Sequence, residues 1–99
     1  MSDPRKLFFT GIPSGVSEIY SEVPWDAELH GLSYHAGEPV LVWSSRDGVG
    51  HLVQKVRREF YVAQLGSELP DDAGEMIGMF IFPNYVNTFH LFEIKQAKN

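Results

Sequence analysis

The amino-acid sequence predicts a mostly β protein, either a small antiparallel sheet or a partly open barrel of five to six strands. Short runs rich in Val, Ile, Phe and Tyr recur along the 99 residues, and clusters of Gly, Pro, Asn and Asp separate them. Aromatic residues make up 13% of the chain, which supplies much buried area to a small core. Asp47-Gly48 stands between two such runs, and Asp-Gly is a preferred pair for a two-residue hairpin turn. We expect residues 1–99 to form one small domain.

Strand composition recurs along the chain, and most of these runs stop at Gly, Pro or Asn. The runs that predict strands are residues 6–10, 17–23, 38–44, 76–82 and 88–95. Residues 76–82, MIGMFIF, are apolar at nearly every position, which predicts a strand buried on both faces. Residues 26–35 are assigned neither to a strand nor to a helix, and Gly31 argues against a long helix there. Residues 66–75, GSELPDDAGE, predict a solvated acidic loop.

The segment 37–66 has two interpretations. In the first, Asp47-Gly48 forms a type I′ hairpin turn that pairs Trp43 with Leu52 and Val42 with Val53; the chain then bends near 58–59 and continues as a strand over 60–65. In the second, the apolar residues of 49–65 recur at helical spacing. That alternative is an α+β fold with one helix at about 49–65 packed on an antiparallel sheet.

Two resemblances accompany these interpretations. The segment GEPVLVWSSRDGVGHLVQKV loosely looks like the opening of Src-homology-like and KOW-type small barrels, which share a Gly before a V-x-V strand, a glycine turn and a returning strand. The Gly48-Val49-Gly50 loop faintly resembles the acyl-CoA loop of GNAT-type acetyltransferases. That family carries Arg or Gln three places before its first Gly, where this chain has Ser45, with Arg46 one place later. The second resemblance implies a small enzyme or ligand-binding domain that holds an anionic cofactor such as acyl-CoA.

Charge and composition exclude several classes of function. The formal net charge is −5, with 13 acidic and 8 basic residues, which disfavours binding of a phosphate backbone. The local cluster Lys55, Arg57 and Arg58 keeps nucleic-acid binding as a second alternative. The chain has no Cys, so disulfides and thiolate metal sites are excluded, and its four His residues lack the spacing of metal ligands. We therefore expect no cofactor and no metal.

These exclusions favour a non-catalytic protein-interaction domain, such as an adaptor, an immunity-type protein or an inhibitor. Its partner would be another protein, and a homodimer is compatible with the sequence. Trp25 is either a lid on the core or an exposed anchor, and interface hot spots are enriched in Trp, Tyr and Arg. The candidate binding residues are therefore Trp25, Trp43, Arg46, Arg57, Arg58 and Tyr61. No apolar run reaches the length of a membrane span, so we expect a cytoplasmic protein without membrane contact.

Overall fold

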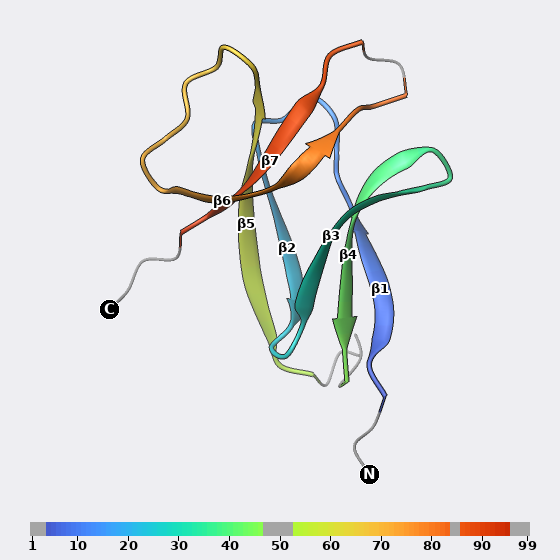
Figure 1. The fold of residues 1–99 in the computed structure, drawn as a ribbon. Helices are drawn as coiled ribbons and strands as arrows, with labels where there is room; N and C mark the ends of the chain where they lie inside the picture. Colours follow the sequence, from blue (N-terminus) through green and yellow to red (C-terminus); the bar gives the residue numbers. More distant parts are fainter. Residues whose placement is uncertain (1–3, 47–52, 84–85, 96–99) are drawn as a thin grey trace.

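The computed structural model describes residues 4–46, 53–83 and 86–95, and within these ranges the chain forms seven strands and no helix. The prediction of a mostly β fold is confirmed, with more strands than the five to six expected (Figure 1). The strands are β1 (Lys6–Gly11), β2 (Glu18–Pro24), β3 (Glu28–His35), β4 (Glu38–Ser45), β5 (Lys55–Gln64), β6 (Ala73–Phe80) and β7 (Phe89–Ile94). The α+β alternative is wrong, because most of the segment proposed as a helix is β5.

The strands form two antiparallel sheets that do not close into a barrel. One sheet has the order β1-β4-β3, and the other has the order β2-β5-β7-β6. The chain passes from the first sheet to the second after β1 and after β4, and it returns after β2 (Figure 1). Residues 26–35, which the sequence left unassigned, contain β3, whose pairing with β4 shifts register between Leu29 and Gly31.

The predicted hairpin between β4 and β5 is wrong. Strand β4 lies between β1 and β3, so both of its edges are occupied, and Val42 faces Phe9 and Gly31 rather than Val53. Strand β5 belongs to the other sheet, where it pairs with β2 in one unbroken register and does not bend at 58–59. The proposed turn at 47–48 and the pairing with residue 52 lie outside the described residues.

A two-residue hairpin does occur, between β3 and β4. His35 pairs with Glu38, and the two residues between them, Ala36 and Gly37, have φ angles of 52° and 82°. Positive φ at both central positions is the requirement of a type I′ turn, whose twist matches that of the flanking strands. This turn fixes the register of β3 on β4 and therefore the side chains that share their outer face.

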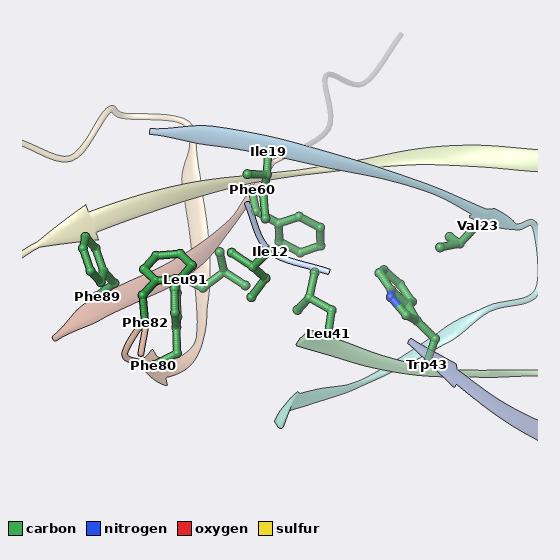
Figure 2. Close-up of a cluster of buried hydrophobic side chains, with 10 residues drawn as sticks. All are labelled: Ile12, Ile19, Val23, Leu41, Trp43, Phe60, Phe80, Phe82, Phe89 and Leu91. Atoms are coloured by element: carbon green, nitrogen blue, oxygen red, sulfur yellow. The ribbon is translucent and has the colours of Figure 1, made fainter. Parts of the chain in front are cut away.

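The core lies between the two sheets, where alternate side chains of each strand point inward (Figure 2). Leu41 and Trp43 on β4 meet Phe60 on β5 and Leu91 on β7, and all four are fully buried. The Trp43 and Phe60 rings pack edge to face, with centroids 6.3 Å apart. A second group of aromatic rings fills the end of the sandwich nearest β6 and β7: Phe80, Phe82 and Phe89.

Strand β6 is not buried on both faces, contrary to the prediction for 76–82. It is the last strand of its sheet and pairs only with β7, so Met76 and Met79 are exposed. Its inner side lies near β3, where Gly78 faces the side chain of Leu32. The acidic loop is shorter than expected, because its last three positions, from Ala73 onward, belong to β6.

Candidate functional site

The first strand has apolar side chains on both of its faces. Phe8 points inward and stacks on Trp43, with ring centroids 6.4 Å apart. Leu7 and Phe9 alternate with it and therefore point outward, where 72% and 49% of their surfaces are exposed. Outward positions of an antiparallel sheet are normally polar, so this row of apolar side chains is unusual.

The apolar row continues across the outer face of the three-stranded sheet. Phe9 lies opposite Val42 on β4, and the ring of His35 on β3 packs against Phe9 at a centroid distance of 4.4 Å. Val40, two residues along β4, is buried although it also faces outward. We call this surface the open face and define it by Leu7, Phe9, His35, Val40 and Val42.

The outer face of the four-stranded sheet has a different character. Glu22 lies opposite Arg57 there, and Tyr20 lies opposite Glu59. Arg57 forms an ion pair with Glu59 at 3.3 Å and also lies 3.8 Å above the centre of the Tyr20 ring. Charged and polar pairs of this kind are typical of a solvated sheet surface. The β2–β5 part of this outer face is therefore more polar than the open face.

A groove of about 560 Å³ borders the open face at the end of β1. Its lining is mostly apolar and includes Phe9, Ile12, His35, Pro39 and Val40. Gly11 lies in the outward row of β1, and a Cβ atom placed on it would have no atom within 4 Å. The missing side chain at this position therefore leaves the groove open toward the edge of the sheet. We call it the Gly11 groove.

The free edge of β1 presents unpaired backbone groups beside this groove. The Ile12 N–H donates to the Pro39 carbonyl at 3.2 Å, in the same register as the β1–β4 ladder. Bonded pairs alternate along an antiparallel ladder, so Lys6, Phe8 and Thr10 also direct their N–H and C=O groups toward β4. The backbone groups of Leu7, Phe9 and Gly11 consequently point away from β4, where no strand of the described chain pairs with them.

The edge of β2, at the corresponding end of the other sheet, is protected. The Val62 N–H donates to the Ser17 carbonyl at 2.8 Å, and the same alternation turns the backbones of Glu18, Tyr20, Glu22 and Pro24 outward. Two carboxylates and a Pro without an N–H discourage pairing with another strand. Strand β1 has no such residues in its outward row. Its edge, with the open face and the Gly11 groove, is the best-formed candidate site.

The sequence-predicted binding residues do not gather into one surface. Trp43 is fully buried, and its indole belongs to the core. Trp25 is not a lid on the core, because 59% of its surface is exposed just beyond β2, where its backbone N–H donates to the Gln54 carbonyl. Arg46 follows β4, and its backbone N–H donates to Asp26.

Arg57, Arg58 and Tyr61 lie on β5, but on different faces. Arg57 and Tyr61 are on the outer face, whereas Arg58 points between the sheets. Arg58 forms a bidentate ion pair with Glu93 and lies 5.3 Å above the centre of the Trp43 ring. Its guanidinium is thus committed to internal partners. Lys55, the third member of the basic cluster, is on the outer side with Arg57, so the three cations do not form one patch.

The phenol of Tyr61 has an acidic partner in the loop before β6. Its hydroxyl donates a 2.9 Å hydrogen bond to the carboxylate of Asp72. This bond raises the pKa of Tyr61 to about 12, with smaller contributions from desolvation and from the Asp72 charge. The contact attaches the acidic loop to the outer face of β5.

Two polar clusters join the end of β4 to neighbouring segments of the chain. Ser44 is buried, and its hydroxyl lies 2.7 Å from His30 Nε2 and accepts a 2.9 Å hydrogen bond from Arg5 Nε. The Ser45 hydroxyl donates to the Asp26 carboxylate at 2.6 Å, which is the main reason that the pKa of Asp26 lies below its ordinary value. Because the Ser44 hydroxyl is buried and engaged on both sides, the cluster links Arg5, just before β1, to β3 and β4, and it does not present a free nucleophile.

Comparisons with protein-family models, with curated proteins and with solved structures found no match. In the described part of the chain, no three His, Asp or Glu side chains are grouped so that they could hold a metal ion. The same residues include no helix that could cross a membrane.

Sequence reasoning missed the site on β1, although a signal was present. The run Leu7-Phe8-Phe9 places bulky apolar side chains on both faces of one strand. A chain of this size has one core, so one of the two faces must remain uncovered.

Proposed function

We propose that this chain is a non-catalytic protein-interaction domain that binds an extended segment of its partner along the free edge of β1. The observation that supports the proposal is the combination of an unprotected edge with an apolar outward row. The backbone groups of Leu7, Phe9 and Gly11 point toward an incoming strand. The side chains of Leu7 and Phe9 form an apolar row on the outer face beside them. Addition of a strand to an exposed sheet edge is a recurring mode of peptide recognition.

The two parts of the site have different roles in this mode of binding. Main-chain hydrogen bonds to Leu7, Phe9 and Gly11 supply affinity that is independent of the partner's side chains. Selectivity comes from the Gly11 groove, because the partner residue opposite Gly11 directs its side chain over the open space there. An apolar side chain fits this position best, since most of the groove lining is apolar.

The alternative functions have less support. An anion loop at Gly48–Gly50 draws its strength from the N-terminus of a following helix, and residues 55–64 are a strand instead. The loop itself lies outside the described residues. Nucleic-acid binding through Lys55, Arg57 and Arg58 requires a common basic surface, whereas Arg58 points inward to Glu93.

A selection of displayed nine-residue peptides on the purified protein tests the proposal. We expect enrichment of uncharged peptides with apolar residues at alternate positions. In amide NMR spectra, the selected peptides should shift the resonances of Leu7, Phe9 and Gly11 more than those of β2. A selection that enriches no peptide, or peptides that act on β2 instead, would count against the proposal.

Gly11→Val is the variant that should lose peptide binding while it keeps the fold. The added side chain enters open space, and the backbone at Gly11 is not in the left-handed region. Val is also favoured in strands, so the fold should be retained. It should nevertheless weaken the binding of the selected peptides at least about tenfold, or 1.4 kcal/mol, because its side chain fills the groove. Ala63→Val is the control, because it enlarges a side chain on β5 in the other sheet, away from β1. Equal binding by Gly11→Val and the parent would contradict the assignment of the groove.

A further inference from the structure

We infer that the segment bound at this edge is β1 of a second copy of the chain, so that the protein forms a two-fold symmetric dimer through β1. The inference rests on the proposed function, because it names the partner for the same edge. Antiparallel pairing of two identical strands is set by one choice, the residue that lies on the two-fold axis. Three features of β1 are compatible with Phe9, and the fit between Leu7 and the Gly11 groove selects it.

The first feature is the pattern of backbone hydrogen bonds. With Phe9 on the axis, Phe9 lies opposite Phe9 of the other copy, and each Leu7 lies opposite a Gly11. These are the three residues whose N–H and C=O groups point away from β4. Three N–H donors from each copy then find acceptors, which gives six hydrogen bonds across the axis. No outward backbone group of β1 is left without a partner.

The second feature is the fit between Leu7 and the Gly11 groove. Leu7 is more exposed than Phe9, at 72% against 49%, and it belongs to the same outward row as Gly11. The axis at Phe9 brings the Leu7 side chain of each copy to the open space beside Gly11 of the other. Both copies therefore bury an exposed apolar side chain in an apolar groove, and the two Phe9 rings meet between them.

The third feature is charge. Lys6 precedes Leu7, whereas Glu38 lines the groove beside Gly11. Antiparallel pairing brings the basic end of each β1 toward Glu38 of the other copy, twice by symmetry. The paired row of Leu7, Phe9 and Gly11 carries no charge, so two chains of net charge −5 meet there without contact between like charges.

The neighbouring register lacks this agreement. An axis at Phe8 places Leu7 opposite Phe9 and Gly11 opposite Arg5. The Gly11 groove would then receive a cationic side chain that already bonds to Ser44 and to the Asp26 carbonyl. The backbone pattern admits both registers, so the side chains decide in favour of the axis at Phe9.

Sedimentation of the full chain over a range of concentrations, from about 1 µM to 1 mM, tests the inference. We expect a monomer–dimer equilibrium. Leu7→Ala and Gly11→Val should each weaken the dimer at least about tenfold, or 1.4 kcal/mol. The double variant should recover most of that loss, because the smaller residue 7 of one copy then faces the larger residue 11 of the other. Ala63→Val should behave like the parent chain, and melting curves should show that all variants are folded.

The outcomes separate this inference from the proposed function. A chain that stays monomeric to 1 mM overturns the dimer, and so does a dimer that neither Leu7→Ala nor Gly11→Val weakens. Two weak single variants whose losses simply add would overturn the axis at Phe9. If the dimer is absent but selected peptides still bind and lose affinity with Gly11→Val, the edge binds another protein and only the dimer is wrong. If neither is observed, the edge is not a binding site.

Discussion

The indole Nε1 of Trp43 donates a hydrogen bond of 3.0 Å to the hydroxyl oxygen of Thr10, deep between the two sheets. The hydroxyl of Ser21 on β2 donates a second bond of 3.0 Å to the same oxygen. Thr10 therefore joins the sheet that carries Trp43 to the sheet that carries Ser21. The three side chains thus form a polar link between the two sheets beside the core.

Replacement of Thr10 by Val should destabilise the fold by about 1–3 kcal/mol, because the buried indole N–H loses its acceptor while the shape hardly changes. Urea denaturation followed by Trp fluorescence measures the free energy of unfolding. Thr10→Ser is the control and should retain most of the stability, since it keeps the hydroxyl. Equal stability of Thr10→Val and the parent would mean that the bond to Trp43 contributes nothing.

Arg58 and Glu93 form an ion pair between the sheets, with 27% and 22% of their side-chain surfaces exposed. Arg58→Met leaves the Glu93 carboxylate without its partner and should cost about 1–3 kcal/mol, less than the loss of a fully buried pair. Arg58→Met combined with Glu93→Leu should recover part of this loss, because neither charge then remains. Chemical denaturation of the parent, the two single variants and the double variant gives the coupling energy between Arg58 and Glu93. Simple additivity of the two losses would contradict a direct pair.

Asp26 should govern part of the acid sensitivity of the protein. Its folded-state pKa lies below the ordinary value of 3.8, mainly through the hydrogen bond from Ser45. A lowered folded-state pKa contributes stability above 3.8 that is lost as the pH falls through the folded-state value. The melting temperature of Asp26→Asn should thus lie below that of the parent near neutral pH, and the gap should shrink on acidification below 3.8. Asp71→Asn, in the loop, serves as control, and a gap independent of pH would refute the role of Asp26.

Ala36 holds a positive φ of 52° in the turn between β3 and β4, a conformation that disfavours residues with a Cβ atom. Asn tolerates this region, and Asn-Gly is the preferred pair for a type I′ turn. Ala36→Asn should therefore stabilise the fold by about 0.5–1 kcal/mol in urea denaturation. Gly37→Ala should have the opposite effect, because φ is 82° there. A loss of stability in Ala36→Asn would show that the turn is not the one described.

The fold class followed from the sequence because strand composition and turn residues act locally. The pairing of strands did not, because it depends on which sheet a strand joins. Asp47-Gly48 is a strong local hairpin signal, yet β4 is already paired on both sides, so the chain after it crosses to the other sheet. The hairpin that does form has Ala36 at a position where Asn or Gly is expected, so its signal was weak.

The candidate site was harder to predict than the fold. Trp and Arg are frequent in binding sites, but Trp43 packs in the core and Arg58 pairs internally, and composition alone cannot distinguish these roles from exposed ones. Whether Leu7 and Phe9 are covered depends on the layers around β1, which the spacing of residues in a single strand does not reveal.

The protected edge of β2 limits how many copies of the chain can associate edge to edge. A sheet that can accept strands at both ends of every molecule grows without limit into fibrils. Here Glu18, Glu22 and Pro24 discourage growth at β2, and register shifts distort the edge strands β6 and β3. Once the β1 edge is occupied, the described strands offer no second edge of equal quality. Assembly through β1 would therefore stop at the proposed dimer instead of continuing to a fibril.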